Sequence, residues 1–248
     1  MITIKSRTEI EKMRIAGKVT GDALKLVEAH IKPGVSTAYL DKIAYDFIKS
    51  KGGTPSFLHY NGFPGSICAS PNDWVVHGIP SKEVILAEGD IISIDMGACV
   101  NGYHGDAART FAVGKISDEA QRLIDVTKQS FFEGIKHAVH GAKLGDVSAA
   151  IQEYVENNGF SVVRDLVGHG IGRNLHEDPN VPNYGHKGKG LRLASGMTIA
   201  VEPMVNAGGY DVCVLDDDWT VVTEDGSLSA HYENTILIKQ GECEILTL

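Results

Sequence analysis

The stretch AEGDIISID, Ala87 to Asp95, decides the fold because a similar stretch recurs later in the chain. The stretch ASGMTIAVE, Ala194 to Glu202, aligns with it position by position, and both stretches end in an apolar residue followed by a carboxylate. The same offset in residue number also aligns an earlier segment, in which Gly34 meets Gly141. One offset without a gap predicts a single domain, residues 1–248, built of two related halves, about 1–113 and 114–248.

Each half reads as helices followed by strands. Apolar residues recur at helical spacing over Glu9 to His30, Ser36 to Lys51, Asp118 to Ala138 and Asp146 to Asn157. Runs rich in β-branched residues follow at Ile91–Ile94, Asp106–Val113, Thr198–Val201, Trp219–Val222 and Tyr232–Ile238. Helices grouped before strands favour the α+β class over alternating βαβ units. We therefore expect a pseudo-twofold α+β domain with its site between the halves.

The composition is that of an ordinary globular protein, with 43% hydrophobic and 22% charged residues. A net charge of −9 argues against a nucleic-acid-binding surface as the main function. The sequence has no apolar stretch of signal length and no run of about 18 apolar residues. The four cysteines are scattered without a CxxC pair. These features predict a cytoplasmic protein with reduced thiols and no membrane span.

Five side chains could together form a metal site. Asp95 and Asp106 flank Asn101-Gly102, a strong turn signal, so a hairpin would bring the two carboxylates together. Two further carboxylates lie next to predicted strands, and one imidazole lies between glycines that allow a close backbone approach. The full set is Asp95, Asp106, His169, Glu202 and Glu233.

Such a cluster is unfavourable unless cations compensate it. Crowded carboxylates repel one another, and burial raises their pKa values further. Two divalent cations would cancel this charge, and oxygen-rich ligation with one nitrogen suits Mn, Fe, Co or Zn. A pair of such ions can activate water and polarise a carbonyl at the same time. The pattern indicates metal-assisted hydrolysis.

Plainer interpretations exist for each member of the set. Asp106 alone would be read as a solvated surface carboxylate, His169 as a loop histidine and Glu233 as part of a surface strand. Asp95 and Glu202 are harder to explain in this way, because both end apolar runs and occupy matching positions of the repeat. The hydrolase interpretation depends on the joint pattern.

Seven motifs resemble those of the type I methionine aminopeptidases in their bacterial form. They are Val76-His77-Gly78-Ile79-Pro80, Ser93-Ile94-Asp95-Met96-Gly97, Gly102-Tyr103-His104-Gly105-Asp106, Gly168-His169-Gly170-Ile171-Gly172, Leu175-His176-Glu177, Val201-Glu202-Pro203-Met204 and Tyr232-Glu233-Asn234-Thr235. The resemblance runs from about Ile10 to the C-terminus. It implies the pita-bread fold, a pseudo-twofold curved antiparallel sheet whose outer face is covered by helices.

The resemblance also implies roles for these residues. Asp106 and Glu233 would bridge two metal ions, Asp95 would hold one ion, and His169 with Glu202 would hold the other. A metal-bound hydroxide would attack the first carbonyl, with Glu202 transferring protons. The catalytic set is completed by two histidines: His176 would stabilise the charge on the carbonyl oxygen, and His77 would contact the scissile amide.

The resemblance further implies an apolar substrate pocket for an unbranched thioether. It is formed by Phe57, Tyr60, Phe63, Cys68, Leu175 and Trp219, together with His77 and His176. Without the family, aromatic residues at this spacing would be read as core. Phe57 replaces a cysteine and Leu175 a phenylalanine of some members, so we expect the shape of the pocket to differ from theirs. Asn72 and Ser229 match positions that hold a structural monovalent cation in some relatives.

The implied function is removal of the N-terminal initiator methionine from nascent proteins whose second residue is small. The expected partners are nascent polypeptide N-termini, with docking to the ribosome left open, and no nucleic acid or membrane. We expect a monomer. Two alternatives share the fold, namely a proline-specific aminopeptidase or prolidase and a catalytically silent binding protein. The first usually carries an extra N-terminal domain, and the second typically loses ligands.

Overall fold

The structure is a computed structural model that describes residues 2–248. Within them the helices are α1 (Arg7–Glu28), α2 (Thr37–Ser50), α3 (Asp118–Ile135) and α4 (Leu144–Asn157), with a 3₁₀ turn η1 (Tyr60–Gly62). The strands of the first half are β1 (Thr54–Pro55), β2 (Cys68–Pro71), β3 (Trp74–Val76), β4 (Ile91–Val100) and β5 (Tyr103–Ala112). The later strands are β6 (Ser161–Val162), β7 (Gly168–Gly170), β8 (Glu177–Val181), β9 (Thr198–Val201), β10 (Met204–Asn206), β11 (Val212–Val214), β12 (Val221–Thr223), β13 (Ser229–His231), β14 (Asn234–Leu237) and β15 (Glu244–Ile245).

The four predicted helices are present, and local capping fixes where they begin. Ser6 precedes α1 and forms a capping box with Glu9, in which each side chain accepts a hydrogen bond from the other's backbone N–H. The Ser36 hydroxyl accepts a hydrogen bond from the Tyr39 N–H at 3.3 Å and begins α2. Gly52, with φ of 74°, follows the end of that helix.

A long antiparallel hairpin joins β4 and β5, with the predicted turn at its tip. Asn101 and Gly102 have φ values of 54° and 76°, as a two-residue type I′ turn requires. The ladder runs without a break from Val100 opposite Tyr103 to Ile91 opposite Ala112. Both strands are longer than predicted, because the turn lets pairing continue to the tip.

A second pairing carries the other two carboxylates. β14 pairs with β9, with Asn234 opposite Val201, and β13 pairs with β10, with His231 opposite Met204. The second ladder continues the register of the first, with no residue inserted or skipped on either strand between them. Between them the Tyr232 N–H donates to the Pro203 carbonyl and the Glu233 N–H donates to the Ala108 carbonyl. The predicted strand Tyr232–Ile238 is therefore observed only as β14, Asn234–Leu237, and it starts late because the Glu233 N–H bonds to the neighbouring hairpin.

One strand starts later than predicted, because a side chain bonds to the backbone before it. The predicted strand Trp219–Val222 is observed as β12, Val221–Thr223. The Asp217 carboxylate accepts hydrogen bonds from the backbone N–H groups of Trp219 and Thr220, at 2.9 and 2.8 Å. These two residues are held in the turn and do not enter the ladder.

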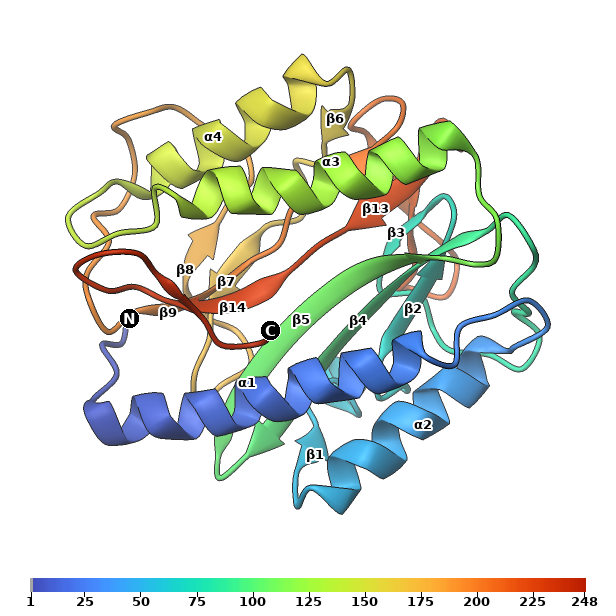
Figure 1. The fold of residues 1–248 in the computed structure, drawn as a ribbon, viewed down its shortest axis with the longest axis horizontal. Helices are drawn as coiled ribbons and strands as arrows, with labels where there is room; N and C mark the ends of the chain where they lie inside the picture. The colour runs from blue at the N-terminus through green and yellow to red at the C-terminus, as the bar shows by residue number, and fades with distance from the viewer. Residues whose placement is uncertain (1) are drawn as a thin grey trace.

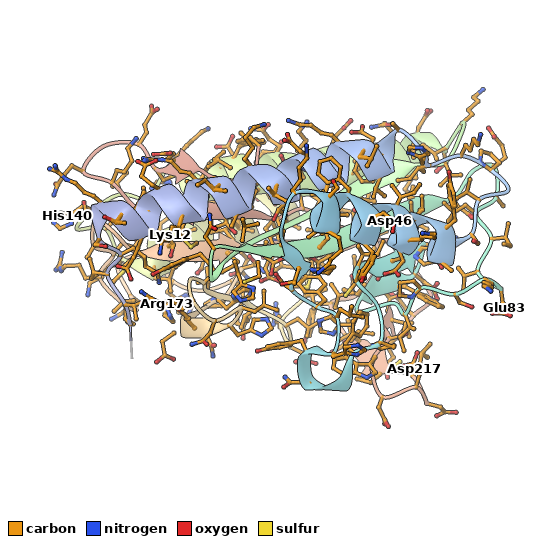
Figure 2. The ribbon with its side chains drawn as sticks, turned by 90° about the horizontal axis from the view of Figure 1, so that it is seen from below. Lys12, Asp46, Glu83, His140, Arg173 and Asp217 are labelled. Carbon is orange, nitrogen blue, oxygen red and sulfur yellow. The ribbon has the colours of Figure 1, made fainter. Side chains whose placement is uncertain are left out.

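The helices lie on one side of the antiparallel strands (Figure 1). Helix α1 packs on β4 and β5 of a four-stranded sheet, and α3 packs on β10 and β13 of a separate three-stranded sheet, so the helices of each half cover strands of that half. Figure 2 shows α1 and α2 on one side of the strands, with the labelled Asp217 on the opposite side. In residues 2–248 no helix is both long and apolar enough to cross a membrane.

The constant difference in residue number that aligns Ala87 with Ala194 also relates the bounds of several helices and strands in the two halves. Applied to α2 it gives both ends of α4, applied to β1 it gives both ends of β6, and applied to the start of β4 it gives the start of β9. Each half also has a large apolar cluster of its own under its helices. The division into halves near residue 113 stays a prediction, since no element marks that boundary.

Candidate metal centre and substrate cavity

A cavity of about 930 Å³ opens on the side of the sheet away from the helices. Among residues 2–248, none of those that line it belongs to α1, α2, α3 or α4. All five predicted metal ligands line this cavity, as do all eight predicted substrate-binding residues. The strands and the loops between them therefore gather side chains from distant parts of the sequence, from Phe57 in the first half to Glu233 in the second.

The hairpin places the first two carboxylates on one face of the sheet. Asp106 lies opposite Gly97, so it is the diagonal neighbour of Asp95 across the ladder. The Asp106 backbone is held from the second half, because its N–H donates to the Thr235 hydroxyl at 2.9 Å. The pairing register of β4 with β5 thus brings Asp95 and Asp106 together, as the sequence predicted.

Glu202 and Glu233 meet by the register of the second pairing. Val201 pairs with Asn234 in the ladder. Glu202 follows Val201 and Glu233 precedes Asn234, so the two carboxylates lie opposite each other. His169 reaches the same centre from β7, with its Nε2 3.5 Å from Glu202 Oε1 and 3.8 Å from Asp106 Oδ2. A Cβ atom on Gly168 would lie 2.4 Å from the Ala200 carbonyl oxygen, so this flanking position needs a residue without a side chain.

Burial shifts the pKa values of the whole cluster. It raises the pKa of Asp95 to about 7, while hydrogen bonds with Glu233 and Asp106 limit the rise. Burial and then the Asp95 charge raise the pKa of Asp106, and burial followed by nearby carboxylates does the same for Glu202 and Glu233. For His169 burial has the opposite effect and lowers the pKa to about 3, so the imidazole is neutral.

The donor set fits divalent cations. Ligand atoms of Asp106, His169 and Glu233 lie within 4.8 Å of one another. Asp95 Oδ1, Asp106 Oδ1 and Glu233 Oε1 are buried and have no hydrogen-bond partner in the structure. Buried oxygens of this kind are unfavourable unless something positive binds them. Carboxylates with one neutral imidazole are suitable ligands for Mn, Fe, Co or Zn.

The two predicted catalytic histidines lie above the carboxylates. The His176 ring stands edge-on to the His169 ring, with centroids 4.3 Å apart, and its Nδ1 is 2.8 Å from the Tyr60 hydroxyl. His77 stands edge-on to Trp219, with centroids 6.4 Å apart. Burial, followed by the proximity of His176, lowers the pKa of His77 to about 4. Both rings are neutral near pH 7, because burial also lowers the pKa of His176.

The predicted pocket residues form one apolar wall. Phe57, Phe63, Cys68 and Leu175 are buried in a common cluster with Tyr60 and Trp219 at its edge. The Phe63 and Trp219 rings are 5.2 Å apart in an edge-on contact. These aromatic residues are therefore core and cavity wall at once, so neither interpretation of the sequence excludes the other.

Asn72 and Ser229 also come together, because the Ser229 N–H donates to the Asn72 carbonyl at 2.9 Å. Their side chains bond to Asp90 and Asn206, respectively. The proposed binding of a monovalent cation there stays a prediction.

The sequence analysis missed His231. This side chain is 1% exposed, and its Nε2 is 3.8 Å from Glu202 Oε2. Both ring nitrogens are buried without a hydrogen-bond partner in the structure. A signal was present, since His231 stands two residues before Glu233 in a strand-like run, where alternate residues share a face. Val76, Leu166 and Met204 also line the cavity, although the sequence assigned none of them a role in the site.

The fold and this donor set define a metal-dependent hydrolase of the pita-bread type. The family model of metallopeptidase family M24 matches residues 11–240. A methionine aminopeptidase from Clostridium acetobutylicum is 60% identical over all of this chain and 99% of its own length. The crystal structure of the methionine aminopeptidase from Rickettsia prowazekii has a TM-score of 0.98 at 45% identity, with both chains covered in full. The chain therefore belongs to metallopeptidase family M24, among its bacterial type I methionine aminopeptidases.

These matches confirm the predicted family and fold class and decide between the enzyme alternatives. A prolidase from Pyrococcus furiosus has a TM-score of 0.80 at 21% identity, and this chain covers 65% of its length. A likeness at that level shows a common fold only. The prolidase alternative is therefore not supported by the comparisons.

Proposed function

We propose that the cavity binds the first residues of a polypeptide and that the five clustered ligands hold two divalent ions beside the first peptide bond. The chain is an aminopeptidase that removes the N-terminal methionine of proteins, and its family uses divalent metal. The observation that carries the proposal is the convergence of four carboxylates and one imidazole in the cavity.

The ligands divide into three groups in this proposal. Asp106 and Glu233 would help to hold both ions, Asp95 would hold one of them, and His169 with Glu202 would hold the other. When bound, divalent ions supply a nucleophile at neutral pH and polarise the carbonyl group under attack. The buried, unpartnered oxygens of Asp95, Asp106 and Glu233 support this assignment.

The protein's own residues then orient the substrate and transfer protons. Glu202 accepts a proton from the attacking water and returns it to the leaving amine, because burial raises its pKa above that of an ordinary carboxyl group. Neutral His176 donates a hydrogen bond to the carbonyl oxygen as charge develops there. Neutral His77, beside Trp219, contacts the scissile amide.

The apolar wall selects the first side chain. Phe57, Phe63 and Leu175 are at most 7% exposed and offer no polar partner, so an unbranched thioether fits better than a charged side chain. We propose that the second residue must be small. We also propose that the chain acts as a monomeric single domain in the cytoplasm on nascent N-termini, with a structural monovalent cation at Asn72 and Ser229.

Three peptides test the proposal directly. Met-Ala-Ser, Met-Pro-Ser and Ala-Pro are incubated with the purified protein and Mn²⁺, with and without a chelator. We expect release of methionine from Met-Ala-Ser and its loss when the chelator is present. Cleavage of Ala-Pro alone would favour a proline-specific enzyme. No cleavage with Mn²⁺, Fe²⁺, Co²⁺ or Zn²⁺ would favour a silent binding protein.

A further inference from the structure

An ion pair buried beside the cavity is not used by the mechanism proposed above. Lys5 Nζ lies 2.7 Å from Glu177 Oε2, and the two side chains are only 5% and 8% exposed. Lys5 is the single buried lysine among residues 2–248. Burying both charges is unfavourable unless further hydrogen bonds satisfy them, so a pair of this kind calls for an explanation other than stability.

Glu177 has the hydrogen bonds that such burial needs. Its Oε2 accepts the Thr3 hydroxyl at 2.8 Å, and its Oε1 accepts the Asn174 N–H at 3.2 Å. Burial alone would raise the pKa of Glu177, but the hydrogen bonds from Lys5, Thr3 and Asn174 outweigh it and lower the pKa. The carboxylate is therefore ionised and tied to the N-terminal segment at two points.

The N-terminal segment is itself fixed to the second half of the chain. The Lys5 N–H donates to the Gly196 carbonyl at 2.8 Å, in the turn that leads into β9. A Cβ atom on Gly172 would lie 2.6 Å from Lys5 Cε and 2.8 Å from Glu177 Oε1. The loop between β7 and β8 thus packs directly on the Lys5 side chain. Thr3 lines the cavity as well.

This loop carries His176 immediately before Glu177. Its other end is held from β5, where the His104 N–H donates to the Gly172 carbonyl at 2.9 Å. The Tyr60 hydroxyl bonds to the ring of His176, but the backbone of His176 is located by the loop that Glu177 anchors. The ion pair therefore fixes the residue directly after His176 in the chain.

We propose that Lys5 is a positioning residue, whose buried ion pair with Glu177 holds the loop so that His176 meets the substrate carbonyl. This inference rests on the proposed function of His176. Without the Lys5 charge, Glu177 is left buried and unpaired, and the loop must move to bring it to water. A displacement of about 1 Å in a catalytic group can lower a rate roughly 100-fold.

The test compares Lys5→Met with a matched control, Arg14→Met. The control breaks the Arg14–Glu244 pair, whose Nε–Oε1 distance is also 2.7 Å and which ties α1 to β15 away from the cavity. We measure kcat and KM for Met-Ala-Ser, the affinity for Mn²⁺ by calorimetry, and Tm. We expect Lys5→Met to lower kcat by roughly 10- to 100-fold, with KM and the Mn²⁺ Kd within about threefold. We expect Arg14→Met to keep kcat within about twofold, even if its Tm falls.

The His176→Ala background separates this inference from the proposed function. If Lys5 acts through His176, adding Lys5→Met to His176→Ala has little further effect on kcat. An equal loss of kcat in both backgrounds, no loss at all, or an equal loss in Arg14→Met would overturn the inference. Failure of the unsubstituted protein to release methionine would refute the proposed function, and this inference with it. Should Lys5→Met not fold, Glu177→Gln removes the same ion pair while keeping an acceptor for Thr3, and the same criteria apply.

Discussion

At the scale of single residues, Glu202 has two neighbours that decide its chemistry. His169 Nε2 lies 3.5 Å from one carboxylate oxygen, and His231 Nε2 lies 3.8 Å from the other. Both imidazoles are neutral because burial lowers their pKa values to about 3. Neither ring therefore offers a positive charge that would lower the pKa of Glu202, which suits a group that must both accept and return a proton.

Glu202→Ala is expected to abolish turnover while the protein still folds. Loss of a general base lowers a rate by roughly 10²–10⁴, and the loss of a ligand adds to this. The fold should tolerate the change, because a buried carboxyl group with a raised pKa contributes nothing favourable at neutral pH without metal. Turnover of Met-Ala-Ser and a thermal melt by circular dichroism check this. The control is Glu153→Ala on the exposed face of α4, where full activity is expected. Normal turnover by Glu202→Ala would contradict the proton-transfer role.

His176→Ala should lower kcat by roughly 10²–10³, the usual loss for one donor to a developing oxyanion. KM should change little, because the hydrogen bond strengthens only in the transition state. Tyr60→Phe removes the hydroxyl that lies 2.8 Å from Nδ1 and should cause a smaller loss, roughly tenfold. Steady-state kinetics on Met-Ala-Ser measure both, with the exposed His186→Ala as control. An unchanged kcat in His176→Ala would remove this residue from the mechanism.

Site residues that end an apolar run could be predicted from the sequence. A site residue that is buried by pairing between distant strands could not. Asp95 and Glu202 were found because their local context and the repeat agree. His231 was not, because its burial arises from pairing with Met204 and from hydrogen bonds of its backbone with Thr110. Lys5 carries no local signal, since its partner Glu177 lies in the other half of the chain.

At the scale of elements, β7 places His169 between two neighbouring strands with no room to spare. A Cβ atom on Gly170 would lie 2.1 Å from the Asp178 carbonyl oxygen, which belongs to backbone that cannot move aside cheaply. The GHG sequence of this strand is therefore a packing requirement of β8 and β9 as well as a way to present the imidazole.

Gly170→Ala should lower the free energy of unfolding by about 1–3 kcal/mol, as overpacking does, and should weaken Mn²⁺ binding by moving His169. Gly241→Ala is the matched control, because nothing lies within 4 Å of a Cβ atom there. That substitution should change stability by less than about 0.5 kcal/mol. Urea unfolding and calorimetric titration with Mn²⁺ provide the two measurements. An equal free energy of unfolding in both variants would show that β7 can shift without a loss of stability.

Helices were easier to predict than short strands. Periodicity and the Ser6 and Ser36 caps are local, so α1 and α2 follow from neighbouring residues. Strands such as β6 and β7, of two and three residues, exist only because distant backbone pairs with them. The offset between the two halves recovered β6 as the counterpart of β1 only after the structure supplied both.

At the scale of the whole molecule, the sheet brings buried carboxylates from both halves to one centre, and this makes stability depend on pH and metal together. Asp95, with a pKa raised to about 7, binds a proton in the folded metal-free protein at pH values where the unfolded chain has lost it. Asp106, Glu202 and Glu233 shift in the same direction. Their contribution to the free energy of unfolding therefore falls as pH rises from about 4 toward 7.

Buried histidines act in the opposite direction. His77, with a pKa of about 4, and His231, with a pKa of about 3, are neutral in the folded protein, so the stability they contribute is lost as pH falls below about 6.5. A simple pH profile of Tm would mix the two effects. The difference in Tm between Mn²⁺-loaded and chelator-treated protein separates them, because neither ring is a proposed ligand and their contributions largely cancel in that difference.

The stabilisation by Mn²⁺ should accordingly be larger at pH 8 than at pH 5.5. Metal binds deprotonated carboxylates and so competes with the protons that burial retains, which weakens its apparent affinity at low pH. Each displaced proton changes the binding free energy by about 1.4 kcal/mol per pH unit, or roughly 3–6 °C in Tm for a chain of this size. Thermal melts at both pH values, with excess Mn²⁺ and with chelator, give the two differences. An Asp95→Asn variant should show a smaller dependence, because one of the titrating ligands is gone. Equal stabilisation by Mn²⁺ at pH 5.5 and pH 8 would mean that the carboxylates are already ionised in the metal-free protein. Their buried negative charge would then be compensated by something other than the cations assigned to them.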